Sequence, residues 1–296
     1  MSWQNWVMSG VLRYRMKPLS RRGLDVARAR AATGRAAPAR LPPGWGIRPS
    51  GSPAGEWIER GTGTYPDHVL LYFHGGGYFF CSPATHRPIT VGLGTAAEIA
   101  VFSLDYRLAP EHRFPAAVED AVAAYRSLRQ SGIPAARIVL GGDSAGGGLA
   151  MSTLLSLRAS GDELPAGAVL FSPWVDLAGT GETLVTNDRS DVMFTGEGIK
   201  AGAHYYLGDT PATDKLASPL YADLAGLPPL FIQASGSEVL LADSTRLADK
   251  ARAAGIAVEI EIWPGLPHVW QIFSPFLPEA RAALAKAGAF IRRVAS

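Results

Sequence analysis

Five consecutive residues near the middle of the chain have the types and the spacing of a nucleophilic serine. They are Gly142, Asp143, Ser144, Ala145 and Gly146, the pattern G-x-S-x-G, and they stand between an apolar run and a helical pattern. A serine on such a sharp turn needs neighbours without bulky side chains, because its backbone is strained and the strand and the helix pass closely. The amide of Ala145 would begin the helix without an intrahelical acceptor, so it could donate to an oxyanion. The pattern predicts acyl-transfer chemistry at Ser144.

A second glycine-rich turn follows an earlier apolar run. His74 is followed by Gly75, Gly76, Gly77 and Tyr78. Three glycines in succession are compatible with a merely flexible loop. Because no Cβ obstructs them, their amides can also approach a carbonyl oxygen closely, as in an oxyanion hole. The presence of this loop and of the serine turn in one chain favours the oxyanion hole.

A serine hydroxyl needs a base, and the base needs an orienting acid. Of the six histidines, only His204 and His268 follow the serine, as the order serine, acid, histidine requires. We expect His268, in a loop after the apolar run 257–263, to be the base, and His204 to lie at the surface or in a pocket wall. Glu238, three residues past the run 229–235, is the preferred acid. Asp243 falls within the next helical pattern, where helix-start or surface electrostatics is the expected role; weaker candidates are Asp176, Asp188 and Asp191.

The elements around these residues predict an α/β protein. Strand-length apolar runs alternate with helical patterns, and each run is bounded by Gly, Pro or Asp. This alternation predicts a mostly parallel central sheet covered by helices on both faces. The expected strands lie within residues 68–74, 100–106, 137–142, 168–174, 229–235 and 257–263, and the clearest helices within 116–131, 145–160, 240–254 and 278–294.

Two regions do not fit the alternation, and we assign both to a small helical cap. They are residues 1–50 and 180–217, which leaves 51–179 and 218–296 for the catalytic domain. Insertions at the carboxyl ends of the strands are where a cover over a site is built. The cap and the glycine loop would supply an apolar wall for the substrate. The expected substrate-binding residues are Tyr78, Phe79, Met193, Phe194, Tyr205 and Tyr206, with Trp3 and Trp6 as further wall residues, although packing between cap and body explains each of these aromatic residues equally well.

The first forty residues carry an uneven charge. They have nine Lys or Arg against Asp25 alone, a net charge of +8, whereas the rest of the chain is −6. The apolar residues Trp3, Trp6 and Val7 precede the basic ones, an order opposite to that of a secretory signal, so a cytoplasmic protein is expected. We expect this apolar stripe to pack on the body of the protein. A helix lying on a membrane surface is the alternative.

Composition excludes several classes of protein. The chain has 296 residues, 47% of them hydrophobic and 18% charged, with a net charge of +2 and one cysteine, Cys81. An intramolecular disulfide and a cysteine-rich zinc module are therefore excluded. No run is long enough to span a membrane, no nucleic-acid-binding motif accompanies the basic residues, and the histidines lack metal-ligand spacing. No metal or organic cofactor is expected.

Taken together, five segments make the chain resemble the hormone-sensitive-lipase-like family of α/β-hydrolases, specifically the bacterial esterases with a GDSAG motif. The segments are HGGGY (74–78), YRLAPEHRFPAA (106–117), GDSAGG (142–147), SPLYADLAGLPPLFIQ (218–233) and GLPHVW (265–270). The resemblance implies the α/β-hydrolase fold, with Ser144 as nucleophile, His268 as base, and the amides of Gly76, Gly77 and Ala145 as oxyanion donors. Where many relatives have Asp-Pro-Leu, this chain has Glu238, Val239 and Leu240, and glutamate serves as the acid in other hydrolases.

The resemblance also implies a function. We expect a carboxylesterase that works through an acyl-enzyme intermediate, and the small cap predicts short to medium acyl esters as substrates. An amidase or peptidase with the same triad is one alternative, and a non-catalytic binding protein on the same scaffold is another. The resemblance implies that the segment 106–117 is structural, with Arg107 and Glu111 as an ion pair. Relatives often dimerise along the last strand, so the resemblance also implies a homodimer.

Overall fold

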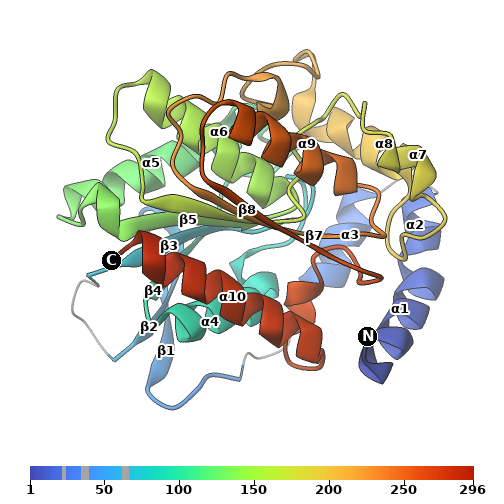
Figure 1. Ribbon diagram of the computed structural model, residues 1–296, viewed down its shortest axis with the longest axis horizontal. Helices are drawn as coiled ribbons and strands as arrows, with labels where there is room; N and C mark the ends of the chain where they lie inside the picture. Colours follow the sequence, from blue (N-terminus) through green and yellow to red (C-terminus); the bar gives the residue numbers. More distant parts are fainter. Residues whose placement is uncertain (22–24, 35–39, 62–66) are drawn as a thin grey trace.

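The computed structural model describes residues 1–21, 25–34, 40–61 and 67–296, and its centre is an eight-stranded sheet (Figure 1). The strands follow the spatial order β1-β2-β4-β3-β5-β6-β7-β8. All pairs from β4 to β8 are parallel, whereas β1 and β2 pair antiparallel with each other and β2 pairs antiparallel with β4. The strands are β1 (Trp45–Gly51), β2 (Ala54–Arg60), β3 (Val69–Phe73), β4 (Ala100–Leu104), β5 (Ile138–Asp143), β6 (Gly167–Phe171), β7 (Leu230–Ser235) and β8 (Val258–Trp263).

The register of the central strands determines which loops meet. Phe73, the last residue of β3, pairs with Gly142 near the end of β5. Because parallel strands end at the same edge of a sheet, the glycine loop after β3 and the serine turn after β5 emerge next to each other. The six expected strands are confirmed, and β8 lies at one edge of the sheet.

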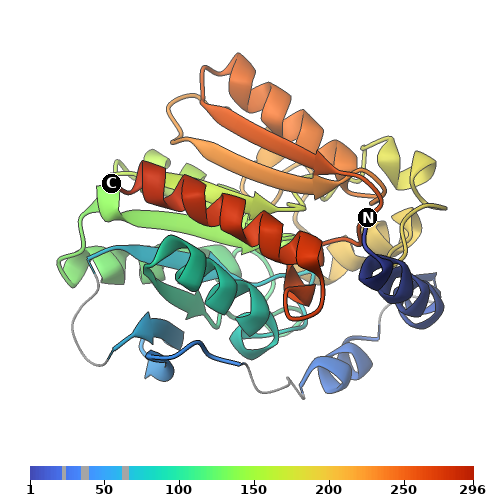
Figure 2. The same cartoon turned by 60° about the horizontal axis from the view of Figure 1, so that its bottom comes forward.

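Helices cover both faces of the sheet, as expected (Figures 1 and 2). Successive residues of a strand point to opposite faces, so Leu71 and Leu140 belong to one buried cluster and Leu70 and Val139 to the other. The first cluster includes residues of α5 (Ala116–Gln130), α6 (Ala145–Ala159) and α9 (Leu241–Ala253), and the second includes residues of α4 (Pro83–Ala97) and α10 (Pro278–Val294). Burial of these two apolar faces stabilises the fold.

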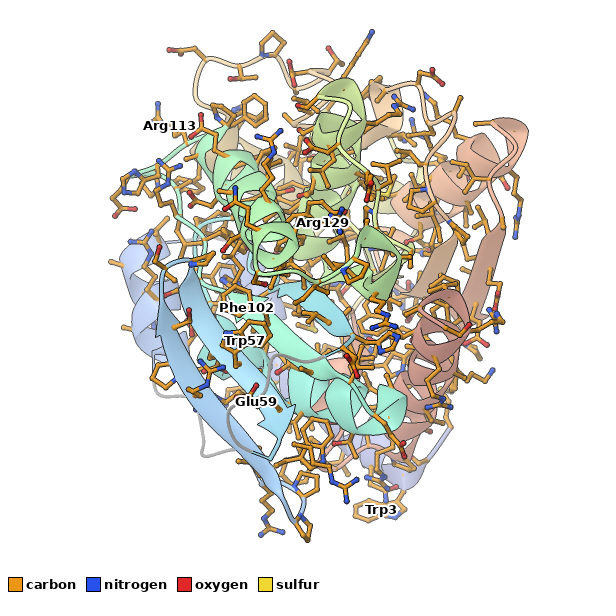
Figure 3. The ribbon with its side chains drawn as sticks, turned by 90° about the vertical axis from the view of Figure 1, so that its left-hand side faces the viewer. Trp3, Trp57, Glu59, Phe102, Arg113 and Arg129 are labelled. Carbon is orange, nitrogen blue, oxygen red and sulfur yellow. The ribbon has the colours of Figure 1, made fainter. Side chains whose placement is uncertain are left out.

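The antiparallel hairpin β1–β2 extends the sheet beyond the predicted strands. Trp57 pairs in register with Phe102 of β4, and their ring centroids lie 4.8 Å apart (Figure 3). The expected end of the cap at residue 50 is therefore wrong. Residues 45–50 belong to β1, because their backbone completes the ladder with β2.

The remaining helices gather beside the carboxyl ends of the parallel strands (Figure 2). They are α1 (Trp3–Arg15), α2 (Lys17–Arg21), α3 (Val26–Thr33), α7 (Thr183–Thr186) and α8 (Gly196–Leu207), while short 3-10 turns, η1 (Ala135–Arg137), η2 (Pro219–Tyr221) and η3 (Trp270–Phe273), stand in the loops. Leu12 of α1 forms a buried cluster with Val192 and Met193. No helix in the described ranges is long and apolar enough to cross a membrane.

The expected packing of the N-terminal apolar stripe on the body is wrong. The side chains of Trp3 and Trp6 are 73% and 80% exposed, and Val7 is also exposed. The opposite face of α1, with Asn5 and Leu12, is the buried one. The helix therefore has apolar residues on both faces, and only one of these faces is covered.

Candidate active site

Ser144 occupies the turn between β5 and α6 in a strained conformation. Its φ and ψ are 51° and −120°, a region that residues with a Cβ rarely adopt. A Cβ on Gly142 would collide with the carbonyl of Gly146, and a Cβ on Gly146 would collide with the carbonyl of Phe73. Glycine at both positions therefore allows the turn from β5 to α6 to pack against the end of β3. In this turn Ser144 is partly exposed and lines a cavity.

The glycine loop lies in the same cavity. Gly76 and Gly77 have φ values of +107° and +60°, and both line the cavity with Ser144. Within the described residues, neither amide donates a hydrogen bond to another protein group. These two N–H groups and that of Ala145 at the start of α6 are free to receive a negatively charged oxygen.

A buried network joins the glycine loop to the serine turn. Asp143 accepts hydrogen bonds from the Tyr72 hydroxyl at 2.7 Å and from the Gly75 amide at 3.1 Å, and its other oxygen lies 3.2 Å from His86 Nε2. Burial alone would raise the pKa of Asp143, but its contacts with His86 and Tyr72 outweigh burial and lower it. The carboxylate thus fixes the loop beside Ser144. Sequence reasoning missed the roles of Tyr72 and His86, and the position of Asp143 inside the serine motif was the available signal.

Glu238 and His268 meet at the end of the sheet, as the sequence predicts. Oε2 of Glu238 lies 2.6 Å from Nδ1 of His268, and Oε1 accepts a hydrogen bond from the amide of Ser235 at 3.0 Å. Both side chains are buried. Among the described residues, His268 Nε2 has no hydrogen-bond partner, and His268 lines the same cavity as Ser144. One ring nitrogen is therefore held by the acid and the other is available to the serine.

The acid also sets the basicity of the imidazole. Burial lowers the pKa of His268, but the charge of Glu238 and its hydrogen bond outweigh burial, and the pKa is raised above its ordinary value. An imidazole with a raised pKa is a better proton acceptor, provided that the pH leaves it neutral.

The other acids considered from the sequence have different partners. Asp243 is buried and accepts hydrogen bonds from the amides of Val175 and Asp176, both at 2.9 Å. Asp191 accepts a hydrogen bond from the amide of Val239 at 2.9 Å and so holds the loop that carries the acid. Asp176 pairs with Arg246, and Asp188 accepts from the Gly196 amide. His204 is exposed on α8. Each of these side chains supports a loop or faces solvent. Within the described part of the chain, the acid that bonds to His268 is Glu238, although the charge of Asp191 also helps to raise the pKa of His268.

The cavity in front of Ser144 has a volume of about 290 Å³ and largely apolar walls. Three of the six expected substrate-binding residues, Phe79, Met193 and Phe194, line it. The ring of Phe194 stands edge-on to His268, with centroids 5.2 Å apart. The N-terminal segment contributes to the wall as expected, but through Leu12, Met16 and Thr33 instead of the expected tryptophans. Sequence reasoning missed these three residues and also the wall residues Trp174, Ile199, Val269, Ile272 and Phe273.

The expectation that Tyr78, Tyr205 and Tyr206 line the cavity is wrong for the described structure. The rings of Tyr78 and Tyr206 stack on each other with centroids 3.7 Å apart, and both are buried. Tyr205 packs against Phe79, with centroids 5.2 Å apart. These tyrosines therefore support the wall from behind, since stacking between α8 and the glycine loop buries their faces. Trp3 and Trp6 also lie outside the wall, on the exposed face of α1.

The expected ion pair between Arg107 and Glu111 is also wrong. Arg107 pairs with Asp120 of α5 at 2.8 Å, and Glu111 pairs with Arg30 of α3 at 2.7 Å. The guanidinium of Arg30 also donates to the carbonyl of Phe79 at 2.9 Å. Arg30 therefore ties α3 to the segment after the glycine loop, and Glu111 holds the guanidinium in place.

Comparison with known proteins finds relatives along most of the chain. A family model described as alpha/beta hydrolase fold matches residues 70–272. An acetyl-hydrolase of Streptomyces hygroscopicus is 45% identical over 252 residues, which cover 85% of this chain and 83% of the relative. A crystal structure of an esterase from the bacterial hormone-sensitive lipase family is 43% identical, with a TM-score of 0.83 over 95% of this chain and 99% of that one. A crystal structure of EstE5 soaked with p-nitrophenyl butyrate is 37% identical, with a TM-score of 0.93 over 100% of this chain and 99% of that one.

Proposed function

The chain belongs to the bacterial hormone-sensitive-lipase-like family of α/β-hydrolases and is a serine carboxylic ester hydrolase, and on that premise we propose that Ser144, His268 and Glu238 are its catalytic triad. The contact that carries this proposal is the 2.6 Å approach of Glu238 Oε2 to His268 Nδ1. It leaves Nε2 of the histidine unpartnered in the cavity that Ser144 lines.

The proposed reaction proceeds through an acyl-enzyme. Ser144 Oγ attacks the ester carbonyl carbon while His268 Nε2 takes the proton of the serine hydroxyl. Glu238 holds the other imidazole proton on Nδ1 and stabilises the imidazolium that forms. The C–O bond of the ester breaks as His268 returns the proton to the leaving alcohol. Water, deprotonated by the same nitrogen, then attacks the acyl carbon. The bond from that carbon to Ser144 Oγ breaks as His268 returns the proton to Oγ, which releases the acid and restores the serine hydroxyl.

The amides of Gly76, Gly77 and Ala145 are the proposed oxyanion donors. Each tetrahedral intermediate places a negative charge on the former carbonyl oxygen, and the loss of one such donor typically slows turnover about a hundredfold or more. The hydrogen bond from the Gly75 amide to Asp143 supports this role, because it fixes the backbone on which Gly76 and Gly77 lie.

We expect uncharged esters with short to medium acyl groups as substrates. Phe79, Met193 and Phe194 give the cavity an apolar lining, and its volume of about 290 Å³ supports a short acyl chain. A cap formed by the helices of residues 1–44 and by 180–217 would cover this cavity. Leu12 and Met193, one from each segment, line it together.

Two further expectations remain proposals. The first is a cytoplasmic location. A homodimer is supported by the position of β8 at the sheet edge, where Ile262 is 43% exposed. Light scattering of the chain and of its Ile262→Lys variant would test the dimer, which the variant should dissociate.

The amidase, peptidase and non-catalytic binding alternatives are not favoured, because the relatives are named esterases and acetyl-hydrolases. A panel of 4-nitrophenyl esters and anilides tests the choice directly. We expect rapid hydrolysis of the esters, and a preference for anilides would instead indicate an amidase.

The Ser144→Ala variant tests the nucleophile. Without the hydroxyl, turnover should fall by at least about a thousandfold. The melting temperature should stay close to that of the unaltered chain, because the small, partly exposed hydroxyl makes no hydrogen bond that the fold needs. Retained turnover would show that another group attacks the ester.

A further inference from the structure

The exposed face of α1 is apolar at its centre and basic at both margins. Successive residues of an α-helix are about 100° apart around its axis. On this basis Trp6, Trp3, Tyr14, Val7 and Val11 occupy one continuous arc, with Arg13 just beyond Trp6 and Arg15 just beyond Val11. The guanidinium of Arg13 also donates to the carbonyls of Arg189 and Ser190, at 3.0 and 3.1 Å. All seven side chains are exposed, and Tyr14 reaches 84%. A helix on the surface of a soluble domain ordinarily presents polar residues outward, so this face requires a partner.

The helix that carries this face is firmly held. The side chain of Asn5 donates to the carbonyl of Gly265 at 2.9 Å, in the loop that carries His268. The amide and the hydroxyl of Ser2 both bond to the carboxylate of Glu279 on α10, at 2.6 and 2.9 Å. Leu12 packs in the buried cluster on the inner side. The outward apolar face is therefore a fixed surface, and Figure 3 shows Trp3 at the outer margin of the molecule.

We propose that this face of α1 docks the protein on an anionic lipid surface. Indole and phenol rings settle at the boundary between headgroups and acyl chains, and flanking arginines bind anionic headgroups. α1 contains no acidic residue, and the first forty residues carry a net charge of +8. A second copy of the chain fits this face less well, because two such faces would bring arginines of like charge together.

The same helix connects the docking face to the catalytic cavity. Leu12 lies on the inner side of α1 and Met16 directly follows its last residue, and both line the cavity with Ser144. Docking would therefore place the cavity beside the lipid surface, where apolar esters concentrate. This consequence rests on the proposed function, whereas the docking itself does not.

Sedimentation with vesicles tests the docking. The full chain is mixed with vesicles of phosphatidylcholine and phosphatidylglycerol in equal parts, and in parallel with phosphatidylcholine alone. We expect binding to the mixed vesicles that is about tenfold tighter or more, and that weakens when the salt is raised to about 0.5 M. Failure of the chain to sediment with either vesicle would overturn the proposal.

Substitutions on α1 identify the face that binds. Trp3→Ala with Trp6→Ala should weaken vesicle binding about tenfold or more. Its turnover of dissolved 4-nitrophenyl butyrate should be unchanged, since neither tryptophan lines the cavity. Arg15→Gln should weaken binding about fivefold. The matched Arg137→Gln, at the end of η1 and away from α1, should leave vesicle binding unchanged. Equal binding by the double tryptophan variant would refute the assignment of this face.

Two controls separate the possible outcomes. Ser144→Ala should bind vesicles as tightly as the unaltered chain does. The docking can therefore be judged even if the proposed catalytic role of Ser144 is wrong. Light scattering without lipid reports the alternative occupant. If the unaltered chain is a dimer that the double tryptophan variant dissociates, the face binds a second copy and the lipid proposal is wrong.

Discussion

Replacing Glu238 by glutamine tests the geometry on which the proposed triad depends. Glutamine has nearly the same shape, so its amide oxygen can still accept the hydrogen bond from Ser235 that Oε1 accepts at 3.0 Å. Its amide nitrogen then faces Nδ1 of His268, at the position of the oxygen that lies 2.6 Å away. Because that nitrogen is a donor, Nδ1 must become an acceptor, and the imidazole proton moves to Nε2. The nitrogen that should deprotonate Ser144 is then already protonated.

The expected loss is large and falls on turnover. A wrong histidine tautomer in a serine hydrolase costs on the order of 10⁴ in kcat, which corresponds to about 5.4 kcal/mol of transition-state stabilisation. KM should change little, since Glu238 does not line the cavity. Loss of activity with unchanged KM would distinguish a defect in catalysis from a collapsed pocket.

The pH profile provides a second signature. His268 must be neutral to act as a base, and Glu238 raises its pKa, so the rate of the unaltered enzyme should fall as the pH drops through a value above the ordinary 6.5 of histidine. Without the negative charge, burial lowers the pKa of His268 unopposed by Glu238. The acid limb of kcat/KM should therefore move to lower pH in the Glu238→Gln variant, even though its maximum is far smaller.

The assay is the hydrolysis of 4-nitrophenyl butyrate from about pH 5 to about pH 9, with Asp243→Asn as the matched control. Asp243 is also a buried carboxylate, but its hydrogen bonds within the described residues come from the amides of Val175 and Asp176. Burial raises its pKa to about 7, so an uncharged side chain should be tolerated near neutral pH. We expect the control to keep kcat within about threefold. The assignment of the acid is refuted if Glu238→Gln stays within tenfold of the unaltered enzyme, or if Asp243→Asn is the more damaging change.

Three other substitutions probe the surrounding structure. Gly76→Ala forces a Cβ against the carbonyl of Phe80 at a φ of +107°, so kcat should fall about a hundredfold or more, and an unchanged kcat would exclude an oxyanion role. Tyr72→Phe removes a buried donor to Asp143 and should lower the free energy of unfolding by about 1–3 kcal/mol. Urea denaturation measures this loss, and an unchanged free energy of unfolding would show that the network does not stabilise the fold. Met193→Trp narrows the cavity and should raise the ratio of acetate to octanoate ester hydrolysis, whereas a preference for longer chains would place the acyl group elsewhere.

Local patterns in the sequence determined the parallel core of the fold. Strands such as β3 (Val69–Phe73) are buried along their whole length, so their residues form continuous apolar runs that can be read without a structure. The hairpin β1–β2 was not predicted, because its strands are partly exposed and contain glycine, proline and charged residues. In addition, the hairpin joins the rest of the sheet through β4, which lies about forty residues further along the chain.

The sequence also determined which residues could do chemistry. Gly76 and Gly142 are required by close approach to the backbone four residues further along the chain, which is a local property, whereas Gly146 is required by the carbonyl of Phe73 on another strand. The preference for Glu238 followed from its position just past a strand. Only the tertiary structure decided how side chains from separate elements meet. It brought His86 to Asp143, turned Tyr78 and Tyr206 away from the cavity, paired Glu111 with Arg30, and left Trp3 and Trp6 exposed. Spacing along one element fixes which residues share a face, but the packing of all the other elements decides what that face meets.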